Sequence, residues 1–201
     1  DESFHFYKVL KDLAKKPDII KVLVLFFIGL GIFNSVSTCI DQLCEQKGLS
    51  VEETGLVGGM MLIAGILGAI ILPAISDKMG KRKPFVILAM LFMAIGIAGL
   101  NFFSDYTLML VSSGLLGFFL LGAGAPVGFQ YSAEVAAPSP ESTTQGLILL
   151  TGQLSGILFV LGINHAGIMP FMKIFIVLSI IAVALTLSLN ESPLTKPSEN
   201  S

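Results

Sequence analysis

Six stretches of this sequence are long and apolar enough to cross a lipid bilayer, and this limits the fold more than any other feature. Spanning the hydrocarbon core takes about 20 apolar residues. Backbone groups cannot stay unpaired in lipid, so such segments must be helices, and these runs are too long and too continuous for barrel strands. The sequence therefore predicts an all-α membrane protein with six transmembrane helices. They are expected at residues 19–43, 54–75, 84–103, 107–135, 142–164 and 168–189.

The connection at residues 76–83 carries four cationic side chains between the second and third predicted helices. Translocating Lys and Arg is unfavourable, so such a loop stays on the cytoplasmic side. Of the twelve Lys and Arg residues, all but Lys47 and Lys173 then lie inside, and both termini are cytoplasmic. The inside residues are Lys8, Lys11, Lys15, Lys16, Lys21, Lys78, Lys81, Arg82, Lys83 and Lys196. A plasma membrane or a bacterial inner membrane is the expected location.

Two flanking segments differ from the transmembrane domain at residues 19–189. Residues 1–18 mix aromatic residues with lysines at helical spacing, which is typical of an amphipathic helix in the cytoplasmic membrane interface. Residues 190–201 are rich in Ser, Pro and Glu and are predicted to be a disordered cytoplasmic tail. The first apolar run spans the membrane and no cleavage site follows it, so it is not a signal peptide. The sequence lacks an initiator Met, which leaves open that it is part of a longer chain.

The sequence carries no recognisable catalytic or metal-binding pattern. Cys39 and Cys44 fit no common zinc spacing and are expected to be buried thiols. His5 and His165 fall on opposite sides of the membrane, and no phosphate-binding glycine loop is present. We therefore expect no enzymatic activity, no catalytic residue, no metal and no cofactor, and no nucleic-acid partner.

Two amide side chains are the best candidates for contacting a solute. Polar residues at membrane depth are costly and are often functional when they face a cavity. Gln153 lies near the middle of the fifth predicted helix, where transporters bind their substrates, and Asn34 lies in the first. The alternative is that Gln153 binds a neighbouring helix and only stabilises packing. No acidic or basic residue lies near the middle of any span, so ion coupling resides in a partner domain or transport is uncoupled.

Glycines are concentrated in the second and fourth predicted helices, where they permit close helix packing. In the fourth, Gly122 and Gly124 precede Pro126, which removes a backbone hydrogen bond and permits a kink. This segment is either a tight packing surface alone or also a hinge that opens the cytoplasmic half of a pathway.

Three charged residues are predicted at the cytoplasmic boundary: Asp77, Arg82 and Glu134. Asp77 near a helix N-terminus, or Glu134 paired with Arg82, would strengthen contacts that close the inner side. Transporters interconvert over a few kcal/mol, so such pairs could shift the populations. The alternative is that these charges only set the topology.

The loop residues Asp77 to Arg82, with Gly80 as the motif glycine, match Asp-[Arg/Lys]-x-Gly-[Arg/Lys]-[Arg/Lys]. This loop resembles the signature of the major facilitator superfamily of transporters, which have two six-helix domains. The resemblance implies that the chain is half of a major facilitator fold.

Three further motifs resemble the second half of the feline leukaemia virus subgroup C receptor family. They are a glycine-Phe-Phe run at residues 117–122, a Pro-x-Gly-Phe-x-x-x-x-Glu segment at residues 126–134, and Gly146-Leu147 followed by Gln153 and Gly156. That family is associated with transport of choline and ethanolamine, and with haem export. The resemblance implies that Gln153 is the substrate-contacting glutamine, while Asn34 falls where the family has an aromatic residue.

We therefore predict half of an alternating-access carrier for a small organic solute, with choline-like or amine-bearing compounds as candidates. Its partners would be the solute, the lipid bilayer, and either a first six-helix half or a second copy in a homodimer. Gln153 and Asn34 would bind the solute, residues 122–126 would flex, and the charged boundary residues would act as a gate. The alternative is a non-transporting membrane module that packs against a partner through its glycine faces.

Overall fold

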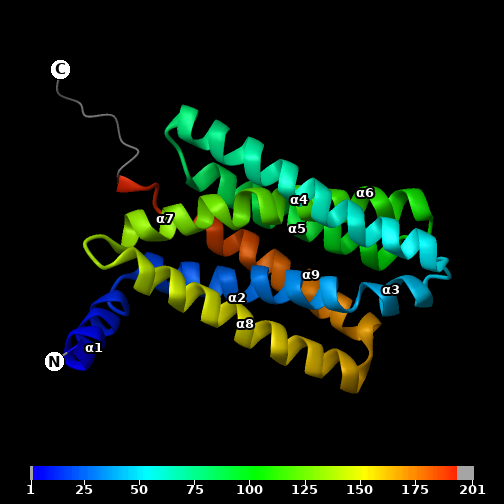
Figure 1. Ribbon diagram of the computed structural model, residues 1–201, viewed down its shortest axis with the longest axis horizontal. Coiled ribbons are helices and arrows are strands. Elements are labelled where there is room, and N and C mark those ends of the chain that lie inside the picture. The colour runs from blue at the N-terminus through cyan, green and yellow to red at the C-terminus, as the bar shows by residue number, and fades with distance from the viewer. Residues whose placement is uncertain (1, 194–201) are drawn as a thin grey trace.

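The computed structural model describes residues 2–193, with side chains from Tyr7 onward. Its described part is helical, and six of its helical stretches are long and apolar enough to cross a membrane, which confirms the all-α fold. Figure 1 shows these crossings side by side, with a short helix at each end of the first one. The elements are α1 (Glu2–Leu13), α2 (Pro17–Thr38), α3 (Ile40–Gln46), α4 (Val51–Met79), α5 (Lys83–Phe102), α6 (Tyr106–Leu116), η1 (Gly117–Gly124), α7 (Pro126–Ala136), α8 (Glu141–Ala166) and α9 (Ile168–Leu187).

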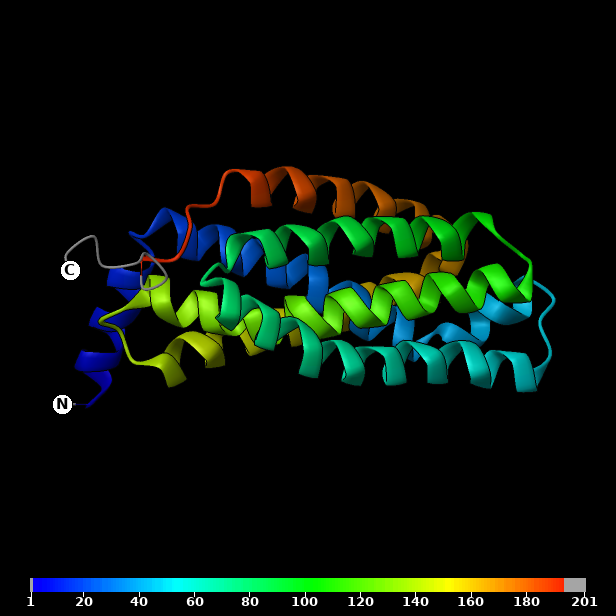
Figure 2. The same cartoon turned by 90° about the horizontal axis from the view of Figure 1, so that it is seen from above.

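The fourth crossing, Tyr106–Ala136, consists of α6, η1 and α7 in direct succession. We call the end of the bundle that carries the α4–α5 and α7–α8 connections the Arg82 end, and the end that carries α3 the Lys47 end. In Figure 1, α4 and α8 form opposite edges, with α2 and the fourth crossing between them. The turned view in Figure 2 places α4 and α9 on opposite sides of the bundle.

The first crossing is shorter than the sequence pattern predicts. It ends at Thr38 rather than at residue 43, because the chain leaves helical geometry at Cys39, whose φ and ψ are −111° and 20°. The remaining residues form the separate helix α3. Hydropathy did not indicate this break, because α3 still buries Leu43 and Cys44 against the bundle.

Helix α4 has clear signals at both ends. The Ser50 side chain accepts a hydrogen bond from the backbone N–H of Glu53, and the Glu53 carboxylate accepts one from the backbone N–H of Ser50. This reciprocal pair satisfies backbone donors in the first turn. At the other end Gly80 adopts a left-handed conformation with φ of 61°, which a residue without Cβ adopts at little cost. The motif glycine therefore terminates α4 two residues before Arg82.

The segments predicted to flank the bundle are described only in part. Residues 2–13 form α1, whose Leu13 packs with Ile19 and Ala136 while Tyr7 stays exposed. The Lys16 ammonium group donates hydrogen bonds to the backbone carbonyls of Ala136 and Ala137, at 2.8 and 2.6 Å, where α7 ends. Of the predicted tail at residues 190–201, the first residues cross the Arg82 end, whereas residues 194–201, including Lys196, lie outside the described residues.

Helix η1 is a π-helix, and its glycines bring the fourth crossing into backbone contact with α4. A Cβ atom at Gly122 would lie 2.6 Å from the Cα atom of Gly68, and one at Gly117 would overlap the backbone of Met61. Small residues allow this approach, which stabilises helix pairs in lipid through packing. The predicted packing role of these glycines is therefore visible as direct contact between two crossings.

Gly117→Ala should lower the stability of the bundle by about 1–3 kcal/mol, because the added methyl group overlaps backbone atoms that cannot rotate away. The measurement is the thermal unfolding midpoint of the purified chain in detergent. Gly58→Ala is the matched control, since its Cβ would lie 3.6 Å from the Ile40 Cγ2 atom, an ordinary contact. Equal midpoints for the two variants would contradict this account of the packing.

Candidate functional site

A shallow polar pocket lies between α2 and α8. It has a volume of about 380 Å³, and Asn34, Thr38 and Gln153 supply its polar side chains. Gly156 is directly behind Asn34, because a Cβ atom there would lie 3.1 Å from the Asn34 Cβ atom. The remaining lining residues are Ile157, Val160 and Leu161.

The structure thus brings both predicted solute-contacting residues, Asn34 and Gln153, to one pocket. Gln153 lies near the middle of α8 with an exposed side chain, and its amide makes no hydrogen bond within the described part of the chain. Its position therefore does not match an amide that joins two helices of this bundle. A primary amide offers two donors and an acceptor, so the pocket can bind a small polar solute through hydrogen bonds.

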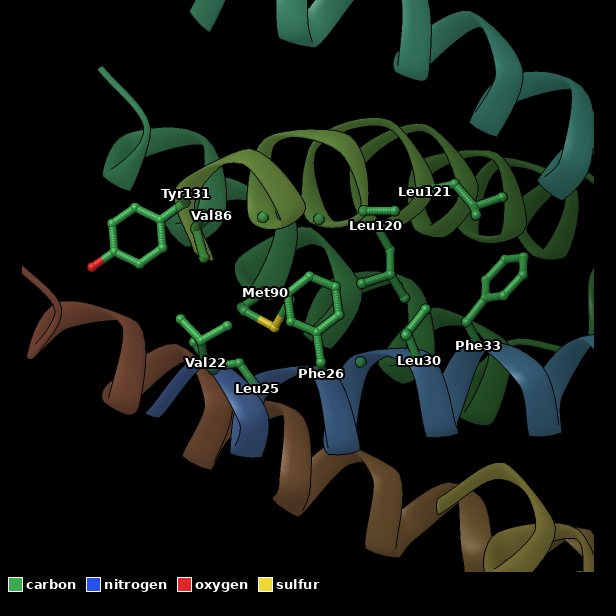
Figure 3. A pocket seen from close by; sticks show the side chains of 14 residues that line it. Val22, Leu25, Phe26, Leu30, Phe33, Val86, Met90, Leu120, Leu121 and Tyr131 are labelled. Carbon is green, nitrogen blue, oxygen red and sulfur yellow. The ribbon is translucent and has the colours of Figure 1, made fainter. Parts of the chain in front are cut away.

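Beside this pocket, an apolar crevice separates α2 from the fourth crossing (Figure 3). Phe26, Leu30 and Phe33 line it from α2, and Leu120 and Tyr131 line it from the fourth crossing. Its enclosed free volume is only about 30 Å³. The crevice is lined in part by Gly124 and Gly128, and it therefore lies where the π-helix passes into α7.

At the Arg82 end, one guanidinium group connects three helices. Arg82 is 6% exposed. Its Nη1 atom donates to Asp77 Oδ1, and to Ser76 Oγ at 3.0 Å, while Nη2 lies 3.3 Å from Glu134 Oε1. The three charged residues predicted at this boundary therefore form one cluster, to which Ser76 is an addition that sequence reasoning missed. Burial disfavours the charge of Arg82, but the Asp77 hydrogen bond and the attraction of Glu134 outweigh it and raise the pKa of the guanidinium.

The chain after α9 also joins this cluster, which sequence reasoning did not predict. Glu191 Oε1 accepts hydrogen bonds from the backbone N–H groups of Arg82 and Lys83, at 2.8 and 3.1 Å. The Ser192 hydroxyl donates to the second carboxylate oxygen of Glu134. The sequence has no capping residue directly before α5, but this does not identify Glu191 as the partner.

The remaining predicted residues, Gly122, Gly124 and Pro126, lie where η1 ends and α7 begins. Gly122 faces α4, whereas a Cβ atom at Gly124 would lie 3.2 Å from the Leu120 Cδ1 atom. Pro126 is the first residue of α7. The geometry thus changes from π to α within the segment predicted to flex.

Cys39 and Cys44 are free and buried, as expected. Burial raises the pKa of both thiols, with a smaller contribution from Asp41, which makes them less reactive. In the part of the chain that the structure describes, no group of His, Cys, Asp and Glu is arranged to hold a metal ion.

The six crossings define a multi-pass membrane protein. The family model of the Major Facilitator Superfamily matches residues 22–200, and the chain belongs to this superfamily. Several of its relatives are named as transporters, and members of this family are typically not enzymes.

Three relatives show how much of a transporter the chain covers. It is 30% identical to an uncharacterised MFS-type transporter of Caenorhabditis elegans over 92% of this chain and 32% of that protein. It is 30% identical to the choline/ethanolamine transporter FLVCR1 of Felis catus over 79% of this chain and 29% of that protein. In these longer proteins the match lies in the C-terminal half. An uncharacterised protein of Archaeoglobus fulgidus is 32% identical over 80% of this chain and 73% of its own length.

Arg82→Met should destabilise the bundle by about 2–4 kcal/mol, because it leaves the mostly buried Glu134 carboxylate without its cationic partner. Thermal unfolding in detergent measures the effect. Lys81→Met is the matched control: it removes an exposed cation from the adjacent position and should change the midpoint little. A Lys81→Met loss as large as that of Arg82→Met would mean that loop charge in general, not the cluster, stabilises this end.

Proposed function

We propose that this chain forms one wall of an alternating-access carrier for a small organic solute, bound at Asn34 and Gln153. The observation that supports this most strongly is the pocket itself. Two amides face this pocket, and they share no hydrogen bond with each other. Unpaired amides facing a pocket at membrane depth are typical of a site that a solute completes.

The carrier needs a second wall, which a first six-helix half or a second copy would supply. Large apolar side chains are exposed along α4 and α8, among them Ile63, Ile70 and Leu158. The pocket is open, so a second six-helix unit facing it would enclose the solute. The solute is an amine-bearing or choline-like compound, a choice supported by the name of the cat relative, a choline/ethanolamine transporter. Since the described pocket has no aromatic lining residue, any cation–π contact would come from the second wall.

The Arg82 end is the cytoplasmic end in this proposal, because it gathers nearly all cationic residues, and α1 lies in the membrane interface beside it. The cluster of Asp77, Arg82 and Glu134 serves as the inner gate. The pivot is the junction of η1 with Pro126, since a π-helix is strained relative to an α-helix and a proline after it removes a backbone hydrogen bond. Helix α7 carries Glu134, so bending there would separate Glu134 from Arg82.

A competing function is that of a membrane module that binds a partner without transport. Two glycines of α4 favour it: Gly55 and Gly59 are four residues apart, and a Cβ atom at either would meet no atom within 4 Å. Such a module would fold and bind its partner, but it would transport no solute.

Gln153→Ala should reduce saturable uptake of labelled choline or ethanolamine by proteoliposomes at least about tenfold, because the site loses its main hydrogen-bonding group. Gln42→Ala is the matched control, since Gln42 is an exposed amide on α3 away from the pocket. Uptake by the folded wild-type assembly that never exceeds empty liposomes would instead support the module.

Asp77→Asn should raise the fraction of carriers open to the cytoplasm, because it removes one of the two carboxylates that bind Arg82. Asp77 itself is exposed to solvent, so this ion pair is worth only about 0–1 kcal/mol and the expected change in the inward/outward ratio is at most about fivefold. Accessibility labelling from each side measures the ratio. An unchanged ratio at normal expression would remove Asp77 from the gate.

A further inference from the structure

The chain segment after α9 makes hydrogen bonds to α2, to the start of α5 and to α7. We call residues 188–192 the clasp. Its backbone accepts hydrogen bonds from the Lys21 ammonium group on α2 at 2.9 Å and from the Tyr131 hydroxyl on α7 at 2.7 Å. The Asn190 amide donates to Asp18 on α2 at 2.9 Å. The clasp thus joins α2, α5 and α7 across the Arg82 end, and Figure 2 shows this stretch running from the end of α9 toward α1 and α7.

Glu191 supplies the hydrogen-bond acceptor that the start of α5 lacks. The first backbone N–H groups of a helix have no partner within the helix, and their partial positive charge favours an anion. Arg82 precedes α5, and no side chain close in sequence caps that helix. The Glu191 carboxylate instead accepts from the Arg82 and Lys83 N–H groups. This residue therefore caps α5 from the far end of the described chain.

The clasp binds both Arg82 and Glu134, the two residues of the gate that connect α5 with α7. Glu191 holds the main chain of Arg82, while the guanidinium group of that residue binds Asp77 and Glu134. The Ser192 hydroxyl binds the Glu134 oxygen that does not face Arg82. Both partners of the bridge between α5 and α7 are therefore also bound to the clasp. Moving α7 away from Arg82 must break the Tyr131 and Ser192 contacts as well.

We propose that residues 188–192 form a clasp that holds the inner gate closed, with Glu191 as a positioning residue for Arg82. The clasp stays on α5 through Glu191 when the gate opens, and releases α7 at Tyr131 and Ser192. This inference rests on the proposed carrier function, because it assigns the clasp to the gate of that carrier.

The test uses Glu191→Ala in the full chain, within its native assembly in lipid nanodiscs. Glu141→Ala is the control, because Glu141 is an exposed carboxylate at the same end that binds Gln145 on its own helix. Hydrogen–deuterium exchange at the start of α5 should accelerate at least about tenfold in Glu191→Ala and not in the control. Glu191→Gln keeps an acceptor oxygen but not the charge, and it should give an intermediate acceleration.

Thiol labelling is a second readout, and it distinguishes a role of Glu191 in the gate from its role as the cap of α5. A single reporter thiol, Gln130→Cys, lines the same recess as Glu134 on α7, and the native thiols are buried. Its labelling by an impermeant maleimide from the Arg82 side should become faster in Glu191→Ala and in Ser192→Ala. Ser192→Ala removes a contact to α7 without touching the cap, so it tests the clasp even if Glu191→Ala folds poorly.

Faster exchange with unchanged labelling would reduce Glu191 to a helix cap and overturn the gating role. Unchanged exchange would overturn the clasp altogether. Neither hydrogen exchange nor thiol labelling depends on uptake. A wild-type assembly that transports no solute would contradict the carrier function, and the two readouts would still test the contacts of the clasp.

Discussion

The hydrocarbon of the bilayer offers no hydrogen-bond partner to a peptide backbone, and the rest of this structure depends on that constraint. It makes each crossing a helix and removes the hydrophobic effect as a force between helices. Close packing must then stabilise the helix pairs instead. The glycines of α4 and η1 let the two backbones approach each other, with Gly122 against Gly68 and Gly117 against Met61. A gap or a clash at this contact would leave the fourth crossing without its main support on that side.

The same constraint explains why the polar groups of this chain can be read as functional candidates. Most buried hydroxyl groups satisfy themselves within one helix: Ser35 donates to the Gly31 carbonyl and Ser179 to the Phe175 carbonyl. Such groups need no partner from another element. Gln153 and Arg82 differ, since the first faces an open pocket and the second binds residues of other helices. The polar chemistry of the proposed carrier is thus divided between a solute pocket and a gate at the Arg82 end.

Much of the fold followed from the sequence because hydropathy and helix length are local properties. Apolar runs alone predict the six crossings and the all-α architecture. The predicted spans and their orientation place Asp77, Arg82 and Glu134 at one boundary. The break at Cys39 and the π-helix could not be predicted, because an apolar segment has the same hydropathy in either helix type. The contact of Glu191 with the start of α5 was also missed. It joins residues from distant parts of the chain, and no periodicity reports such a pairing.

The central claim is that the pocket of Asn34 and Gln153 opens to each side of the membrane in turn. The most direct test is a reporter thiol at Ile157→Cys, which lines this pocket while the native thiols are buried. The assembled protein would be treated with an impermeant maleimide from one side or the other. The account predicts labelling from both sides, with saturating solute slowing it in each case. A thiol that reacts from neither side, or from one side only regardless of solute, would contradict alternating access.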